Sequence, residues 1–179
     1  MFDSIRYISK MFKYFFIILI SFTVSISTAL ADKSMKIGKK GKPEDVTRII
    51  KVLMYDNYFE PSSFKVQSGE TIKFEVENVG ELVHEFNIAN QTMHKEHQSE
   101  MQKMVEMEIL LADSIDKDKM KKMSKMDKSM AHSHANSVLL EPKSSKDLIW
   151  KFENVSNIEI ACNVPGHYDV GMIAKVEIN

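Results

Sequence analysis

The sequence predicts an all-β protein, a Greek-key β-sandwich or small barrel of about eight short strands, interrupted once by a helical or disordered insertion. Three observations support this prediction. Short β-type segments follow one another from Thr47 to Ile88 and again from Ser137 to Asn179. Helical periodicity does not occur among them. Between residues 91 and 135 the chain has no glycine, proline or aromatic residue, so this stretch cannot supply β core.

The first 31 residues have the order of a secretory signal peptide. Arg6, Lys10 and Lys13 precede the apolar run YFFIILISFTVSI, and the small-residue site ALA at 29–31 follows it. Cleavage before Asp32 would release a periplasmic protein. A membrane association is expected only if the segment stays uncleaved, and its apolar core is short for a spanning helix of about 20 residues.

The charge balance excludes some classes of partner. The whole chain carries a formal net charge of −1. Loss of residues 1–31, with their three basic side chains and one acidic side chain, brings the net charge to −3. Such a balance offers no basic field for nucleic acid, so we expect no nucleic-acid partner. Residues 32–46 are lysine-rich with two glycines and a proline, which predicts a flexible lead-in before a single domain at 47–179.

The first β-type segments precede the insertion. They are TRIIKVLMY at 47–55, SFKVQ at 63–67 and TIKFEVEN at 71–78, and a turn at 68–70 joins the last two. In the third segment apolar residues alternate with charged ones, which is typical of a strand with one buried face. We expect these strands to be short and to pair in antiparallel fashion.

A fourth strand is predicted at LVHEFNI, residues 82–88. The two-residue period places His84 on the same face as Phe86 and Ile88, so its imidazole should point inward. After the insertion the β texture resumes in four further segments. These segments are SVLLEP at 137–142, DLIWKF at 147–152, NIEIAC at 157–162 and GMIAKVEIN at 171–179.

The same period places two sulfur side chains inward near the C-terminus. Cys162 shares a face with Ile160, and Met172 shares a face with Ala174. Both lie at strand ends next to the loop ACNVPGHYDVGM. Pro165 and Gly166 should make the turn that returns His167 toward the same place.

Cys162 is the only cysteine of the chain, so an internal disulfide cannot form. The cysteine count alone leaves open an inert buried thiol, an intermolecular disulfide and a metal ligand. Taken singly, His84 is more often a core histidine, and Met172 is more often plain packing. Together with His167 they make a set of two imidazoles, one thiolate and one thioether, which suits copper better than zinc.

The residues that suggest copper also carry a family resemblance. The pattern C-x-x-P-G-H-x-x-x-G-M from Cys162 to Met172 is similar to the ligand loop of rusticyanin-like cupredoxins, the blue type 1 copper proteins. The stretch FEPSSFKVQSGETIKFEVENVGELVHEF, ending at Phe86, also resembles the early strands of that family. The resemblance implies a two-sheet sandwich with one type 1 copper at its end. The implied ligands are His84, Cys162, His167 and, axially, Met172.

The insertion at residues 91–135 departs from small members of that family. Ser99 and Gln102 resemble a capping box, and a second helix is expected from about Asp116 to Met130. We expect a helical hairpin or a largely mobile segment, because large side chains for a core of its own are lacking. The candidate ligands for extra copper ions in the insertion are Met93, His94, His97, Met101, Met104, Met107, Met120, Met123, Met126, Met130, His132 and His134.

Two interpretations of those methionines and histidines stay open. They either pack on the sandwich as adaptable filler or capture copper, and paired histidines that bracket the methionines favour capture. The methionine- and histidine-rich insertion resembles copper-tolerance cupredoxins. We therefore expect a periplasmic, redox-active copper protein that serves copper handling, with copper ions as its partner.

The alternative function is a dedicated electron carrier with a redox protein partner. Catalysis is not expected, because the predicted β domain holds only His84 and His167 as histidines. Reductase and oxidase relatives of the family need further copper centres, and a binuclear site of the oxidase kind needs a second cysteine.

Overall fold

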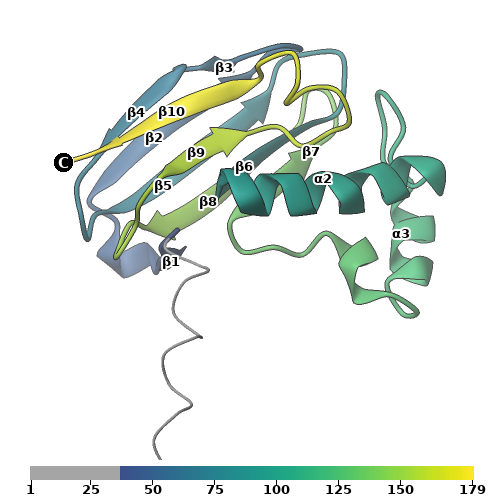
Figure 1. The fold of residues 1–179 in the computed structure, drawn as a ribbon, viewed down its shortest axis with the longest axis horizontal. Helices are drawn as coiled ribbons and strands as arrows, with labels where there is room; N and C mark the ends of the chain where they lie inside the picture. Colours follow the sequence, from purple (N-terminus) through teal and green to yellow (C-terminus); the bar gives the residue numbers. More distant parts are fainter. Residues whose placement is uncertain (1–36) are drawn as a thin grey trace, which may run out of the picture. The chain divides into compact units, whose positions relative to one another are not determined.

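Two five-stranded β-sheets pack face to face in the computed structural model, which describes residues 37–179 (Figure 1). The predicted signal peptide, residues 1–31, lies outside the described residues. The first sheet has the order β1-β8-β5-β2-β3 and the second β4-β10-β9-β6-β7. The strands are β1 Lys39–Lys40, β2 Arg48–Met54, β3 Phe59–Glu60, β4 Ser63–Val66, β5 Thr71–Asn78, β6 His84–Asn90, β7 Ser137–Leu140, β8 Ser145–Lys151, β9 Ile158–Ala161 and β10 Ile173–Ile178.

Aromatic side chains from both sheets fill the space between them. Phe74 of β5 and Phe86 of β6 come from opposite sheets, and their ring centroids lie 5.2 Å apart. Phe64 of β4 packs edge-on against both rings. All three side chains are buried, which matches the alternation of apolar residues along each strand. The predicted sandwich is confirmed, and each of the eight predicted segments overlaps a strand. The two-residue strands β1 and β3 were not predicted.

Two strand pairs differ from the expected antiparallel arrangement. β2 pairs with β5 in parallel, with Ile50 opposite Phe74, and β4 pairs with β10 in parallel, with Phe64 opposite Val176. Between β2 and β5 the chain crosses to the other sheet as β4 and returns. Strand direction therefore follows from these crossovers, which the alternation within a single segment does not encode.

The predicted flexible lead-in at 32–46 is wrong for residues 37–46. β1 pairs with the edge of β8, and the indole Nε1 of Trp150 donates a hydrogen bond to the carbonyl oxygen of Ile37 at 2.6 Å. Ile37 is buried in the core. Gly38 has φ +94°, and a Cβ there would lie 2.3 Å from the carbonyl oxygen of Lys151. Glycine at position 38 thus lets the chain lie close to the backbone of β8. The polar, lysine-rich composition of the segment did not indicate this contact.

The insertion is helical, with α2 at Gln91–Glu106, α3 at Lys117–Met123 and a short 3-10 helix, η2, at Lys128–Ala131. α2 begins directly after β6, because the Asn90 side chain accepts a hydrogen bond from the Met93 amide at 3.0 Å and caps the helix. The predicted start near Ser99 is therefore wrong. The second predicted helix is also shorter than expected, since α3 ends at Met123.

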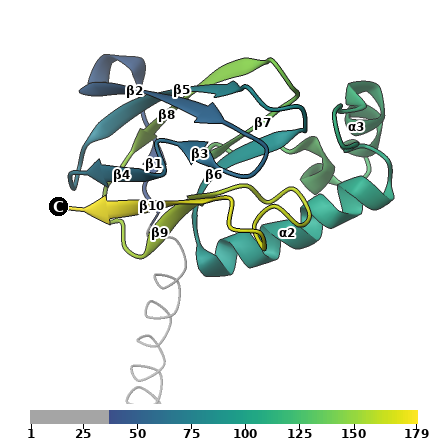
Figure 2. The same cartoon turned by 90° about the horizontal axis from the view of Figure 1, so that it is seen from above.

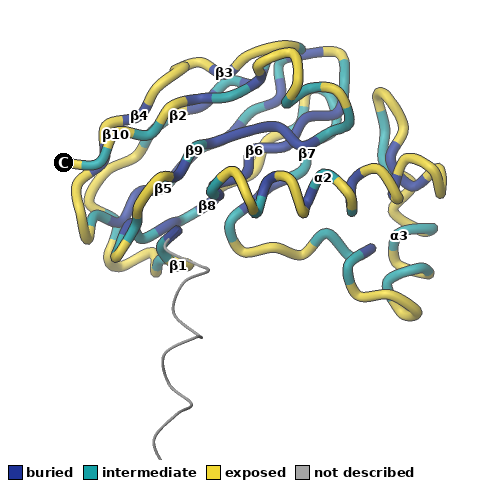
Figure 3. Tube along the Cα trace, viewed as in Figure 1, coloured by how far each residue is buried: buried dark blue, intermediate teal, exposed yellow. Residues whose placement is uncertain are grey.

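A second hydrophobic cluster lies under the insertion, contrary to the prediction that it could not bury a core. Methionine supplies much of it, because its flexible thioether chain fills irregular space. The buried members are Val83, Met101, Met104, Ile109, Leu110 and Met130. α2 contacts β6 and β9 on the outer side of the second sheet and shows alternating buried and exposed positions (Figures 2 and 3). Among the described helices, none is long and apolar enough to cross a membrane.

Candidate metal centre

Three predicted ligands meet at one end of the second sheet. His84 is the first residue of β6, Cys162 follows the last residue of β9, and His167 lies in the loop between β9 and β10. β6 and β9 are neighbouring antiparallel strands, with Asn87 opposite Ala161. This pairing brings His84 and Cys162 into contact, although 78 positions separate them in the sequence.

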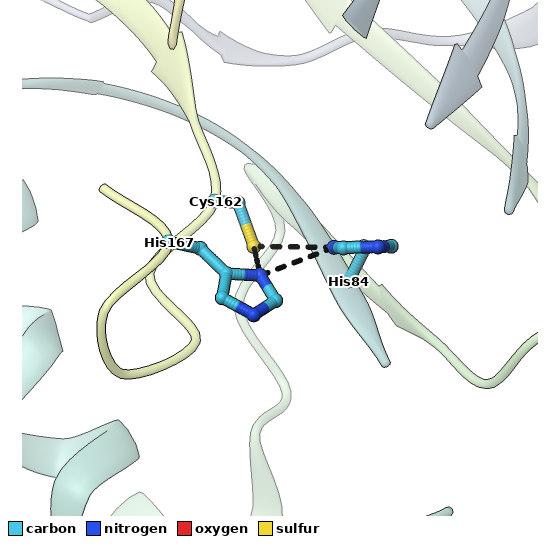
Figure 4. A group of neighbouring side chains, drawn as sticks. All are labelled: His84, Cys162 and His167. Carbon is cyan, nitrogen blue, oxygen red and sulfur yellow. Dashed lines mark hydrogen bonds between the residues drawn. The ribbon is translucent and has the colours of Figure 1, made fainter. Parts of the chain in front are cut away.

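The donor atoms of these three side chains converge (Figure 4). The Sγ atom of Cys162 lies 3.4 Å from Nδ1 of His167 and 3.9 Å from Nδ1 of His84. The two Nδ1 atoms lie 3.2 Å apart. His84 and Cys162 are fully buried, whereas His167 keeps partial contact with solvent. Two imidazole nitrogens and one sulfur at these separations form a donor set that fits copper.

Met172, the fourth predicted ligand, ends the loop that carries His167 and directly precedes β10. Its carbonyl oxygen accepts a hydrogen bond from the Cys162 amide at 3.1 Å, and its own amide donates to the His167 carbonyl at 3.0 Å. The side chain is fully buried in the main core. Backbone hydrogen bonds therefore hold Met172 next to Cys162 and His167. The role of Met172 as axial ligand stays a prediction.

The loop turns where the sequence predicted. The His167 amide donates to the carbonyl of Val164 at 3.0 Å, across Pro165 and Gly166. Gly166 has φ +88°, a left-handed conformation that glycine adopts without strain. This short turn aims the imidazole back toward the end of β9.

Asp56 completes the centre and was missed by sequence analysis. Its Oδ1 atom lies 3.0 Å from Nε2 of His84 and also accepts hydrogen bonds from the amides of Glu81 and Leu82. A ring that donates from Nε2 keeps its Nδ1 lone pair free toward Cys162. The hydrogen bond with His84 is the main cause that lowers the pKa of Asp56. Asp56 lies in a loop after β2, where no periodicity connects it to His84.

Burial sets the protonation of the donors. Desolvation lowers the pKa of His84, and desolvation together with the neighbouring His84 lowers the pKa of His167. Both imidazoles are therefore neutral near pH 7, with lone pairs available. Burial raises the pKa of the Cys162 thiol to about 12, although the Glu85 amide donates a hydrogen bond to its sulfur at 3.3 Å. A metal ion must displace that proton to bind.

Three of the four histidines of the insertion form one group. His97, His132 and His134 lie together, and they meet two carboxylates that sequence analysis did not connect with them, Glu85 and Glu100. Strand period places Glu85 on the face of β6 opposite His84. It does not show that the insertion covers that face and brings two histidines to the carboxylate.

His94 lies apart from the other histidines. Its Nδ1 atom is 3.1 Å from Oδ1 of Asn163, and the ring is fully buried. Burial is the largest cause that lowers the pKa of His94. It is not part of any group of three converging donors found among residues 37–179.

The methionines of the insertion are distributed over several environments. Met101, Met104 and Met130 are buried in the second cluster, and Met120 and Met123 pack against it. The others pack against the main core or are exposed: Met93 is partly buried, Met107 is 39% exposed and Met126 is 81% exposed. Five of the eight methionines therefore lie in or against one packed cluster, and their role as copper ligands stays a prediction.

Comparisons with known proteins agree with the geometry. A family model described as a cupredoxin-like domain matches residues 15–113, which include His84 and end before Cys162 and His167. The copper-resistant cuproprotein CopI of Pseudomonas aeruginosa is 40% identical over 155 residues, covering 79% of this chain and 81% of that protein. The protein of the same name from Rubrivivax gelatinosus is 27% identical over 148 residues, covering 82% of this chain and 76% of that protein.

Solved structures support the fold alone, because their sequence identity is low. Auracyanin B superposes with a TM-score of 0.55 at 12% identity, covering 79% of this chain and 96% of that chain. Dithionite-reduced auracyanin from Roseiflexus castenholzii superposes with a TM-score of 0.52 at 16% identity, covering 74% of this chain and 97% of that chain.

Proposed function

Since the chain belongs to the cupredoxin-like domain family, we propose that it is a periplasmic type 1 copper protein that serves copper tolerance and can transfer electrons. The observation that carries the proposal is the convergence of His84, Cys162 and His167 on one buried point. Bound copper would supply one-electron chemistry between Cu(I) and Cu(II). Met172 is proposed as the weak fourth ligand.

The residues around the centre suit this role. Neutral imidazoles offer nitrogen lone pairs, and Asp56 holds the His84 ring in one orientation. The buried thiol is shielded from disulfide exchange, which a single cysteine in an oxidising compartment requires. The copper-tolerance part of the proposal is supported by the relatives that carry the name copper-resistant cuproprotein.

The experiment is a Cu(II) titration of the mature protein and of Cys162→Ser, with the visible thiolate-to-copper band and the bound metal followed together. The wild type should become coloured, and the variant should not. As a matched control, Met126→Leu changes an exposed thioether and should leave the band intact. A colourless wild type would refute the proposal.

Copper tolerance requires a cellular test. A strain that lacks the gene should grow poorly in elevated copper, and the wild-type gene should restore growth while Cys162→Ser should not. Equal growth of the deletion strain and its parent would contradict the tolerance role. Recovery of the protein in the periplasmic fraction with Asp32 at its N-terminus would support export.

A second candidate function, transfer of electrons to a redox protein, is favoured by the exposed side of the centre. His167 is the partly exposed donor, and Val170 of the same loop is 67% exposed. An exposed apolar side chain in the same loop as a partly exposed ligand offers a redox partner a contact close to the metal. Val170→Glu should slow electron exchange with a c-type cytochrome without changing the visible band. Unchanged exchange rates would argue against docking at this loop.

We propose no catalytic turnover beyond redox cycling. The prediction rests on the residues of the β domain, where two histidines and one cysteine serve a single centre. Steady reduction of nitrite by the copper-loaded protein would overturn it.

A further inference from the structure

Strand β6 has chemically active side chains on both of its faces. His84 points into the candidate metal centre, and the next residue, Glu85, points to the opposite face, where the insertion covers the sheet. Glu85 is fully buried. A buried carboxylate is costly unless other groups compensate its charge, so its surroundings are informative.

Two imidazoles of the insertion meet this carboxylate. Oε1 of Glu85 lies 3.0 Å from Nε2 of His97 in α2 and 2.9 Å from Nε2 of His132, which follows η2. The two Nε2 atoms lie 3.3 Å apart. Three donor atoms from β6, α2 and the end of η2 thus converge, although 47 sequence positions separate Glu85 from His132.

A further carboxylate orients the first of these rings. Nδ1 of His97 lies 2.9 Å from Oε2 of Glu100, so Nδ1 can carry the proton while the Nε2 lone pair faces the other two donors. The same arrangement occurs in the first centre, where Asp56 contacts the remote nitrogen of His84. The other oxygen of Glu85 accepts a hydrogen bond from Nδ2 of Asn163 at 2.8 Å.

The backbone of His132 turns directly after η2. Its φ of 44° and ψ of 47° lie in the left-handed region, which is unfavourable for a residue with a Cβ. A left-handed residue is common at the end of a helix, and the His132 amide closes the last turn of η2 by a hydrogen bond to the Ser129 carbonyl. Here the left-handed conformation accompanies the placement of the His132 ring against Glu85.

The cluster also has an opening. A cavity of about 150 Å³ is lined by residues that include His97, Glu100 and His134. Nε2 of His134 lies 3.6 Å from Oε2 of Glu100, at the more exposed side of the cluster. An ion could therefore reach the buried donors from solvent past His134.

We propose that Glu85, His97 and His132 form a second metal site, separate from the first and selective for a divalent first-row cation, with His134 and Glu100 at its entrance. Two imidazoles and one carboxylate suit Cu(II), which binds nitrogen and oxygen donors most tightly among these cations. The site deepens the proposed copper-handling function and rests on it for the choice of metal. It lacks a thiolate, so its Cu(II) would not produce the intense visible band.

The alternative is a purely structural role for the cluster, in which protonated imidazoles neutralise the charge of Glu85. Burial works to raise the pKa of Glu85, but hydrogen bonds from His132 and His97 outweigh it and hold that pKa well below its usual value. Burial likewise works to lower the pKa of His97, but Glu85 and Glu100 raise it to about 9. An ion-paired cluster would therefore be stable without a metal, and binding stoichiometry distinguishes the two roles.

The test titrates metal-free mature protein with Cu(II) and follows bound copper, the visible band and electron paramagnetic resonance. Wild type should bind two equivalents, of which only one contributes to the visible band. The double variant His97→Ala/His132→Ala should keep the band and bind one equivalent. Cys162→Ser should lose the band and also bind one equivalent, with the resonance spectrum of a copper that has no thiolate ligand. His94→Gln, which changes an α2 histidine outside the cluster, should retain both equivalents.

The outcomes separate this proposal from the proposed function. A wild type that binds a single, coloured equivalent would overturn the second site and leave the first intact. A wild type without the band whose bound copper disappears in the double variant would refute the type 1 centre and support the second site. If the double variant lost its band through misfolding, His132→Gln replaces it. That variant must keep the band and lose one equivalent, and retention of both equivalents would overturn the proposal.

Discussion

Oδ1 of Asp56 lies 3.0 Å from Nε2 of His84, on the side of the ring opposite Cys162. The same oxygen accepts the amides of Glu81 and Leu82, so the carboxylate is held in place by the backbone of the loop before β6. Asp56 thereby fixes both the orientation and the tautomer of a candidate ligand from a position 28 residues earlier in the chain.

Asp56→Ala should weaken copper binding at the first centre by about 10–100-fold, because the His84 ring loses the acceptor that orients it. A competition titration against a chelator of known affinity measures this change. Asp56→Asn keeps an oxygen acceptor and should show a smaller loss. Equal affinity of Asp56→Ala and wild type would show that the hydrogen bond does not position the ligand.

Gly80→Ala should disturb the same pair sterically. A Cβ at this position would lie 2.2 Å from Oδ1 of Asp56 and 3.1 Å from Nε2 of His84. We expect a loss of about 1–3 kcal/mol in the free energy of unfolding, typical of overpacking, together with a shifted visible band. Gly69→Ala is the control, because its Cβ would meet no atom within 4 Å. The control carries backbone strain from a φ of +85° but should keep the wild-type band.

Met101→Ala should lower the free energy of unfolding by about 2–5 kcal/mol, because it opens a cavity in the second cluster. Met101 is fully buried, whereas Met126 is 81% exposed, and Met126→Ala should change stability little. Denaturant unfolding, followed by circular dichroism, measures both. Similar small effects in the two variants would indicate that the buried methionines are not packing residues.

Glu141 should make the attachment of the insertion sensitive to acid. Its carboxylate accepts a hydrogen bond from the Ile115 amide at 2.9 Å and pairs with Lys117. The Lys117 hydrogen bond is the largest cause that lowers the pKa of Glu141 from 4.5. A lowered folded-state pKa means that this stabilisation is complete above pH 4.5 and is lost as the pH falls through the folded value.

The free energy of unfolding, measured between pH 3 and pH 6, checks this pH dependence. This range extends about one unit or more to each side of the ordinary carboxyl pKa. Glu141→Gln should be less stable than wild type at pH 6, and the difference should shrink toward pH 3. Glu108→Gln, which changes a largely exposed carboxylate of the insertion, serves as the control. A constant difference across this range would contradict a role for the Glu141 charge.

Much of the first centre was predictable because strand period fixes which side chains point inward. His84, Cys162 and Met172 were each placed on a buried face from local alternation, and the structure buries all three. The turn that returns His167 was predictable from Pro165 and Gly166. These inferences need only neighbours along the chain.

The second cluster was only half predictable. Paired histidines in the insertion were recognisable by composition, but their carboxylate partner Glu85 lies on a strand that precedes the insertion. The start of α2 at the cap Asn90, rather than at Ser99, decides which helix residues face β6. The residue at which α2 starts sets the direction of each methionine and histidine side chain. Composition alone therefore cannot tell which of these side chains face β6.

By itself, the sequence determined eight of the ten strands, the inward direction of His84, Cys162 and Met172, and the identity of three converging donors. Only the tertiary structure decided which strands pair in parallel and how the segment around β1 packs against Trp150. It also decided the contacts of Asp56 and Glu85 with their histidines. The spacing of apolar residues along a strand or helix shows which face of that element is buried, but not which other element covers it. Contacts between elements depend on how the chain crosses from one sheet to the other, and that path is set by the packing of the whole core.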